Sequence, residues 1–211
     1  MIDHNVHTKK IITAGRKIEQ AKKVLIMVHG RGGNARDILS LSGHLQVNDF
    51  ALLAPEATSY TWYPFSFLAP PQQNEPWLSS ALALLREIIN DINANGISSE
   101  NIYLLGFSQG ACLTLEFAAR NATRFGGVVA FTGGLIGDKI YADNYKGDFN
   151  GTPIFIGTSD PDPHVPVARV NDTVAILKKM NANVAVKIYP NMGHTISKDE
   201  IDTVNEIIFT L

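Results

Sequence analysis

The residues that could do chemistry begin with a serine held between two glycines. Gly106, Ser108 and Gly110 form a Gly-X-Ser-X-Gly motif, which follows a short apolar run and precedes residues that favour a helix. A strand, a sharp turn and a helix are therefore predicted, with Ser108 at the tip of the turn, where glycine avoids collision with neighbouring backbone. This arrangement exposes the hydroxyl and points backbone N–H groups toward an anion. The motif thus predicts a nucleophilic serine, although a motif this short can also be an ordinary glycine-containing turn.

A serine hydroxyl is a poor nucleophile until a base accepts its proton, so a histidine and an orienting carboxylate are needed. His194 lies in a loop after one predicted strand, and Asp160 and Asp162 share the turn after another. His164 also follows these aspartates, but it is only two residues from Asp162, so acid and base would share one short proline-bound loop. His194 is therefore the preferred base, whereas the residues alone leave the acid open between Asp160 and Asp162.

A second glycine-rich loop, at 29–34, follows the apolar run at 23–28. It lacks the Gly-Lys-Ser/Thr ending of a phosphate-binding loop and the glycine spacing of a dinucleotide site. We interpret it instead as an oxyanion loop, in which the backbone N–H of Arg31 points at the same position as the N–H of Gln109. His29 is interpreted as a residue that shapes this loop.

The segment from Pro55 to Pro76 is rich in proline and aromatic residues and has no regular period, which excludes a regular helix or a central strand. Long loops in compact domains commonly serve function. We interpret Trp62, Phe65 and Phe67 as an apolar wall for the acyl part of a substrate. The alternative is that these aromatic side chains simply pack on the core.

Strands and helices alternate along the rest of the chain. An edge hairpin is expected over 6–19, strands over 23–28, 50–54, 101–105, 127–132, 152–157 and 184–189, and helices over 35–46, 76–95, 111–121, 167–180 and 198–211. Ser197 and Glu200 predict a capping box at the start of the last helix. This alternation is typical of an α/β fold, a mainly parallel central sheet with helices on both faces, whose working loops lie at the carboxyl ends of the strands.

Size and composition narrow the class of protein. With 211 residues, 45% of them hydrophobic and 18% charged, the chain is expected to form a single domain over 1–211 with no large cap domain. A net charge of −2 without a long basic run argues against nucleic acid as a partner. No apolar stretch is long enough to span a membrane, and the polar N-terminal residues do not predict a secretory signal.

Cysteine and histidine usage gives two further expectations. The single cysteine, Cys112, fits a reducing cytoplasm and is expected to be a buried core residue. The six histidines are scattered without metal-ligand spacing, so neither a metal nor another cofactor is expected. His4, His7 and His44 are expected on the surface.

In chain order, the motifs resemble the serine carboxylesterase and phospholipase-like branch of the α/β hydrolases, which includes the acyl-protein thioesterases. The resemblance rests on His-Gly-Arg-Gly-Gly at 29–33, Gly-Phe-Ser-Gln-Gly-Ala at 106–111, Asp-Pro-His-Val-Pro at 162–166 and Gly-His-Thr-Ile at 193–196. It implies the α/β-hydrolase fold, with its serine–acid–histidine order in Ser108, Asp162 and His194. It also implies oxyanion donors at the backbone of Arg31 and Gln109.

The predicted function is hydrolysis of a carboxylic ester, thioester or lysophospholipid through an acyl-enzyme on Ser108, with His194 as base and Asp162 as orienting acid. Arg31 stands where the thioesterases usually have leucine, and 62–67 is unlike their loop, so a small ester or thioester is expected. Two alternatives stay open: a non-catalytic hydrolase-fold protein that binds a small ligand, and a serine peptidase. The oligomeric state is open, and a homodimer is among the states that the sequence allows.

Overall fold

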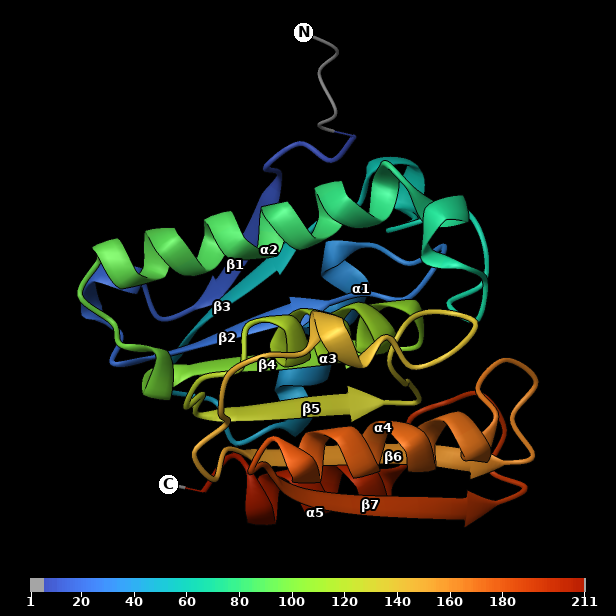
Figure 1. Cartoon of the computed structure of the whole chain (residues 1–211). Helices are drawn as coiled ribbons and strands as arrows, with labels where there is room; N and C mark the ends of the chain where they lie inside the picture. Colours follow the sequence, from blue (N-terminus) through green and yellow to red (C-terminus); the bar gives the residue numbers. More distant parts are fainter. Residues whose placement is uncertain (1–5, 211) are drawn as a thin grey trace, which may run out of the picture.

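A mainly parallel β-sheet runs through the molecule (Figure 1). The structure is a computed structural model that describes residues 6–210. Within that range the sheet has seven strands in the order β1-β3-β2-β4-β5-β6-β7, and every neighbouring pair is parallel except β1 with β3. The strands are β1 (Ile11–Gly15), β2 (Lys23–Val28), β3 (Phe50–Pro55), β4 (Ile102–Phe107), β5 (Gly127–Phe131), β6 (Pro153–Asp160) and β7 (Asn183–Pro190).

Helices cover both faces of the sheet. They are α1 (Ala35–Leu39), α2 (Trp77–Ala94), α3 (Gln109–Arg120), α4 (Val167–Lys179) and α5 (Lys198–Ile207). Helices α2, α3 and α4 pack on one face, whereas α1 and α5 pack on the other (Figure 1). The predicted class, an α/β-hydrolase fold with a mainly parallel sheet covered on both faces, is confirmed. None of the helices within residues 6–210 combines the length and hydropathy that a membrane-spanning helix needs.

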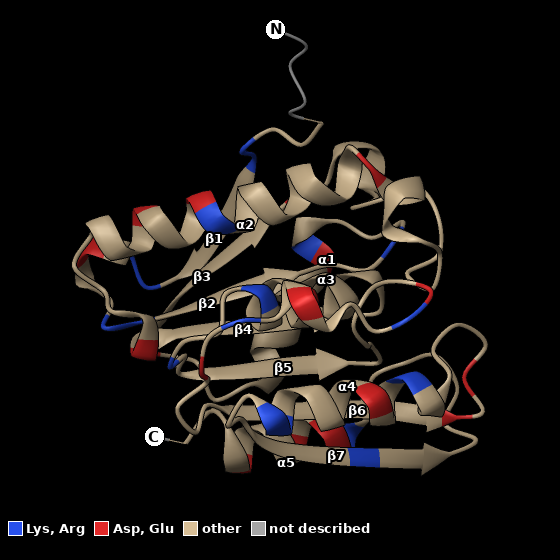
Figure 2. Cartoon of the chain, viewed as in Figure 1, with Lys and Arg blue, Asp and Glu red and all other residues tan. Residues whose placement is uncertain are grey.

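The central strands are apolar along their whole length because both of their faces are covered. In β2, Val24 and Ile26 point into the core layer beneath α2–α4, while Leu25 and Met27 point into the layer beneath α1 and α5. All four side chains are fully buried. Charged side chains of both signs lie on the helices and the loops, and the edge strand β7 carries Lys187, whereas β4 and β5 carry no charged residue (Figure 2).

Two predicted elements differ from the structure near the N-terminus. Residues 6–19 do not form a hairpin: β1 pairs with β3 instead, and a short 3-10 helix at Ile18–Gln20 follows it. The edge of β3 supplies backbone hydrogen-bond partners along the whole of β1, so β1 does not need a hairpin partner from residues 16–19. The helix expected over 35–46 is α only to Leu39 and continues as a 3-10 helix over Ser40–His44, because Ser42 and Gly43 are poor helix formers.

His7 is buried, which makes the expectation of a surface residue wrong. Its backbone N–H donates to Ser80 Oγ at 2.9 Å, and its ring nitrogens contact Trp62 O and the N–H of Thr58 at 3.0 and 3.2 Å. These partners belong to α2 and the 55–76 segment, which cover the residues before β1. His44 is exposed as expected, and the prediction for His4 lies outside the described residues.

The parallel topology brings four loops to one edge of the sheet. In Figure 1 the arrowheads of β5, β6 and β7 point to the same side, and β2 and β4 run parallel to them, so the loops after these strands gather there. The candidate residues Arg31, Ser108, Asp162 and His194 follow β2, β4, β6 and β7 respectively. The capping box predicted from Ser197 and Glu200 is present at the start of α5, directly after the His194 loop.

Candidate active site

Ser108 occupies a tight turn between β4 and α3. Its backbone has φ 54° and ψ −119°, a conformation that is strained for a residue with a side chain. A Cβ atom on Gly106 would lie 2.3 Å from Gly110 O, and one on Gly110 would lie 2.2 Å from Val28 O. Neither position can therefore carry a side chain without moving backbone. The two glycines let the turn close tightly and hold Ser108 above the carboxyl end of the sheet.

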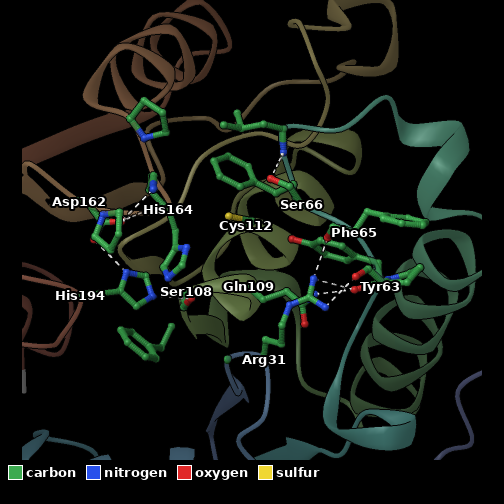
Figure 3. Close-up of a pocket in the computed structure, with 18 residues that line it drawn as sticks. Arg31, Tyr63, Phe65, Ser66, Ser108, Gln109, Cys112, Asp162, His164 and His194 are labelled. Carbon is green, nitrogen blue, oxygen red and sulfur yellow. Dashed lines mark hydrogen bonds and ion pairs between the residues drawn. The ribbon is translucent and has the colours of Figure 1, made fainter.

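Ser108, His194 and Asp162 form one hydrogen-bonded chain (Figure 3). His194 Nε2 lies 2.7 Å from Ser108 Oγ, and His194 Nδ1 lies 2.8 Å from Asp162 Oδ2. An ionised carboxylate only accepts hydrogen bonds, so neutral His194 carries its proton on Nδ1 and offers a free Nε2 lone pair to Ser108. The arrangement can draw a proton from the serine hydroxyl.

Asp162 is held by its own loop as well as by His194. Its Oδ1 accepts the backbone N–H groups of His164 and Val165, both at 2.8 Å. Burial acts to raise the pKa of Asp162, but the hydrogen bonds from His194 and from these two N–H groups outweigh it, so that the pKa lies below its ordinary value. The carboxylate thus stays ionised at neutral pH, which is the form that orients a histidine.

The two rival residues lie beside this chain. Asp160 is exposed at the end of β6, and its backbone carbonyl accepts the N–H of Asn191 at 2.9 Å. His164 is also exposed, and its ring stands edge-on to the ring of His194, with centroids 4.9 Å apart. Of the two acids and two bases considered from the sequence, the structure brings Asp162 and His194 to Ser108.

The loop after β2 lies against the serine turn. A Cβ on Gly30 would lie 3.3 Å from Phe107 O and 3.4 Å from Ser108 Cβ. His29 shapes this loop from within: its Nδ1 lies 2.8 Å from Gly30 O, and its Nε2 accepts the N–H of Ala57 at 3.1 Å. Burial lowers the pKa of His29, so the ring is neutral with its proton on Nδ1.

The backbone N–H groups of Arg31 and Gln109 are available to a ligand. Among the hydrogen bonds within residues 6–210, neither group donates to a protein acceptor. Gln109 is the first residue of α3, where N–H groups have no partner inside the helix. Two such donors beside Ser108 are what a developing oxyanion needs.

The side chains of the same two residues hold the aromatic segment. The Arg31 guanidinium donates to the carbonyl oxygens of Tyr63, Pro64 and Phe65 at 2.9, 2.9 and 2.7 Å. Gln109 Nε2 donates to Tyr63 O at 2.8 Å. These contacts help to fix the position of the segment beside the serine turn. Sequence reasoning assigned work only to the backbone of these residues and missed their side chains, whose partners lie more than 30 positions away.

Trp62 does not line the cavity, so the structure does not support its assignment to the substrate wall. The side chain is fully buried, and its indole N–H donates to His29 O at 2.8 Å. A buried indole N–H needs an acceptor, and the carbonyl at the start of the oxyanion loop supplies it. Trp62 therefore holds the start of this loop from the buried side. Phe65 and Phe67 do line the cavity, Phe65 being half-exposed and Phe67 buried.

A cavity of about 640 Å³ extends over Ser108 (Figure 3). Its walls come from the serine turn and from the segments at 63–68 and 162–166, and Cys112 lies among the lining residues. Burial raises the pKa of the Cys112 thiol to about 12, so it is protonated and not nucleophilic. No cluster of three or more His, Cys, Asp or Glu side chains in the described part of the chain is placed to hold a metal ion.

Comparisons with known proteins agree with this geometry. Residues 8–211 match the family model described as phospholipase/carboxylesterase. A crystal structure of a phospholipase/carboxylesterase from Dyadobacter fermentans is 56% identical, with a TM-score of 0.96 over 97% of this chain and 98% of that one. A carboxylesterase structure from Bacillus cereus, 21% identical, shares the fold with a TM-score of 0.76 over 93% and 92% of the two chains.

Several curated relatives bear the name acyl-protein thioesterase 1, and two of them illustrate the match. The protein from Kluyveromyces lactis is 28% identical over 210 residues, which cover 90% of this chain and 92% of the relative. The protein from Gibberella zeae is 34% identical over 116 residues, which cover 54% of this chain and only 49% of the relative. The match therefore spans about half of the second relative and nearly all of the first.

Proposed function

Because this chain belongs to the phospholipase/carboxylesterase family and is similar to proteins named acyl-protein thioesterase, we propose that it cleaves esters or thioesters through an acyl-enzyme on Ser108. The observation that carries the proposal is the hydrogen-bonded chain from Ser108 Oγ through His194 to Asp162, at 2.7 and 2.8 Å. Beside this chain lie the Arg31 and Gln109 N–H groups, which have no protein acceptor within residues 6–210, and a cavity opens over Ser108. The enzyme class is that of a carboxylesterase-type serine hydrolase.

In acylation, Ser108 Oγ attacks the carbonyl carbon of the substrate while its proton passes to His194 Nε2. The carbonyl oxygen becomes an oxyanion, which the N–H groups of Arg31 and Gln109 stabilise. Asp162 stabilises the imidazolium without accepting its proton. His194 then donates the proton to the leaving oxygen or sulfur, the bond to the leaving group breaks, and the acyl group remains on Ser108.

Deacylation repeats these steps with water as the nucleophile. His194 takes a proton from the water molecule, whose oxygen attacks the acyl carbon, and the oxyanion forms again in the same place. The bond to Ser108 Oγ breaks and the proton returns to that oxygen. The carboxylic acid leaves, and the free enzyme is restored.

The substrate that we propose is a small ester or thioester. The cavity over Ser108 has about 640 Å³, which is within the usual size of a small-molecule site, and Phe65 and Phe67 give it an apolar wall for the acyl group. We further propose that residues 1–211 act as a single domain. A cytoplasmic location is also part of the proposal and rests on Cys112 as the one thiol of the chain.

The test compares wild type, Ser108→Ala and His194→Gln on p-nitrophenyl butyrate and on the matching p-nitroanilide. We expect the wild type to hydrolyse the ester far faster than the amide, and each variant to lose about a thousandfold or more in kcat. Full ester turnover by Ser108→Ala would contradict the proposal. Comparable turnover of the anilide would favour a peptidase, and ligand binding without turnover by wild type would favour a binding protein.

A further inference from the structure

A second, smaller cavity adjoins the oxyanion loop. It has a volume of about 260 Å³ and shares Gly30, Arg31 and Phe107 with the large cavity. Its remaining walls include Ile38 and Leu41, which belong to the core layer beneath α1 and α5. The large cavity is instead walled by residues such as Phe67 and Val165 from the layer beneath α2–α4. The two cavities therefore extend from the serine turn toward opposite faces of the sheet.

The second cavity presents a mainly apolar surface, although Arg31 and Asp37 also line it. Ile38 is buried, and Leu41, Phe107 and Ile196 are half-buried, so their side chains are partly available to a ligand. The two charged side chains beside them already have partners. The Arg31 guanidinium binds backbone carbonyls, and Asp37 Oδ2 accepts the N–H of Asn34 in the capping box of α1 at 2.9 Å.

The cavity also lies beside the proposed general acid. The ring of Phe107 packs on the ring of His194, with centroids 5.3 Å apart, and Ile196 follows His194 by two residues in the same loop. A general acid must come within hydrogen-bond reach of the leaving atom. The space between Phe107, Ile196 and the oxyanion loop therefore lies next to the residue that would protonate the leaving group.

We propose that this second cavity binds the leaving alcohol or thiol of the substrate, and that this group is small, apolar and uncharged. The proposal rests on the function proposed for Ser108 and His194. An apolar cavity of about 150 Å³ is enough to hold benzene, so the 260 Å³ found here has room for one aromatic ring or an alkyl group of similar size.

This assignment narrows the substrate class. The leaving group of a lysophospholipid carries a phosphate charge, and burying a charge on apolar side chains without a partner is costly. Esters and thioesters of hydrophobic alcohols and thiols are therefore expected to be better substrates than lysophospholipids. The acyl group then occupies the larger cavity, on the side of Phe65 and Phe67.

Kinetics can separate the two subsites because all esters of one acid give the same acyl-enzyme. The identity of the alcohol affects kcat/KM through acylation, but it cannot affect deacylation. The experiment measures kcat/KM for methyl, butyl and benzyl acetate, and separately for p-nitrophenyl acetate, butyrate and hexanoate. The first series varies only the leaving group, and the second varies only the acyl group.

Three variants make the test specific. Leu41→Phe fills the second cavity and is expected to lower the ratio of kcat/KM for benzyl over methyl acetate by about tenfold. Leu68→Phe, in the large cavity, is expected to change the hexanoate-to-acetate ratio instead. Ile207→Phe changes a partly exposed residue near the end of α5 and serves as the matched control. Fluorophosphonate labelling of Ser108 is measured in every variant.

The proposal is supported if Leu41→Phe lowers the benzyl-to-methyl ratio of kcat/KM while the hexanoate-to-acetate ratio stays at its wild-type value. The proposal is overturned if Leu41→Phe changes the hexanoate-to-acetate ratio instead of the benzyl-to-methyl ratio. It is also overturned if this variant changes neither ratio while the fluorophosphonate still labels Ser108. Faster turnover of lysophosphatidylcholine than of the benzyl ester of the same fatty acid by wild type would also overturn it. Loss of labelling in wild type itself would instead contradict the function proposed for Ser108.

Discussion

The side chains of Arg31 and Gln109 donate to the same atom, the carbonyl oxygen of Tyr63, at 2.9 and 2.8 Å. These are also the two residues whose backbone N–H groups we propose as oxyanion donors. This carbonyl group therefore helps to fix the wall of the large cavity to the oxyanion site. A guanidinium suits this place because its donors form a rigid planar fork, so it also reaches the carbonyls of Pro64 and Phe65.

Replacing Arg31 should loosen the wall. We expect Arg31→Leu to lower kcat/KM for short-chain esters by about tenfold, since a hydrogen bond to a charged group contributes about 1.5 to 3 kcal/mol. Its preference among p-nitrophenyl esters of increasing acyl length should also become broader. Arg31→Lys should restore little, because an ammonium group cannot span three carbonyls. Arg36→Leu changes an exposed residue on α1 and is the control. If Arg31→Leu kept the wild-type dependence of kcat/KM on acyl length, the Arg31 side chain would not fix the cavity wall.

The orienting acid can be tested against its near neighbour. Asp162→Asn removes the charge that holds the Nδ1 proton of His194, and we expect kcat to fall by about a thousandfold to ten-thousandfold, as when such a carboxylate is removed elsewhere. Asp160→Asn changes an exposed carboxyl two residues earlier and should keep most activity. The measurement is kcat on p-nitrophenyl butyrate for both variants. An equal loss in the two would show that the acid is wrongly assigned.

The serine turn tolerates no side chain at Gly110. An alanine there would bring its Cβ to 2.2 Å from Val28 O, so the turn or strand β2 must shift. We expect Gly110→Ala to destabilise the fold by about 2 to 4 kcal/mol, which lowers Tm by about 5 to 15 °C. Gly43→Ala is the matched control, because a Cβ atom at that position would have no neighbour within 4 Å. Thermal unfolding, followed by circular dichroism, measures Tm for wild type and both variants. If Gly110→Ala and Gly43→Ala had the same Tm, the expected clash at Gly110 would be refuted.

Stability should fall in mild acid because two histidines are buried in the neutral form. Burial lowers the pKa of both His7 and His29. The unfolded chain binds protons at these sites near their ordinary pKa of about 6.5. The contribution of the two sites to the free energy of unfolding is therefore fully present above that pH, and it is lost as the pH falls below it. Urea unfolding at about pH 7.5 and about pH 5.5 measures the difference.

A histidine variant isolates the contribution of one site. His7→Gln removes the titrating ring while keeping a donor toward Trp62 O, so its free energy of unfolding should depend less on pH than that of wild type. His44→Gln, at an exposed position, should leave the pH dependence as it is in wild type. If His7→Gln and wild type showed the same dependence, His7 would not be the source of the acid sensitivity.

The sequence was most informative where structure is local. Ser108, Asp162 and His194 follow β4, β6 and β7, and their gathering at one edge of the sheet follows from the rule that parallel strands bring their carboxyl ends together. The capping box of Ser197 and Glu200 needs only three residues, and it is present. The apolar run of β2 indicates a strand covered on both faces, and the two core layers cover it.

Side chains with distant partners were the part that could not be predicted. Trp62 finds its acceptor at His29 O, 33 positions away, and His7 finds Ser80, 73 positions away. Nothing in the local pattern distinguishes such buried residues from exposed ones, because the aromatic segment has no period. The role of the Arg31 side chain was hidden for the same reason: its partners are backbone carbonyls, which every residue carries.

The most direct test of the central claim is to identify the residue that carries the activated nucleophile. Wild type is treated with a fluorophosphonate, which reacts with an activated serine, and the intact mass and the peptide that carries Ser108 are measured. We expect one adduct for each chain, located on Ser108, with none in Ser108→Ala and much slower labelling in His194→Gln. An adduct on another residue, or an unlabelled wild type that still hydrolyses p-nitrophenyl butyrate, would contradict the assignment of Ser108 as the nucleophile.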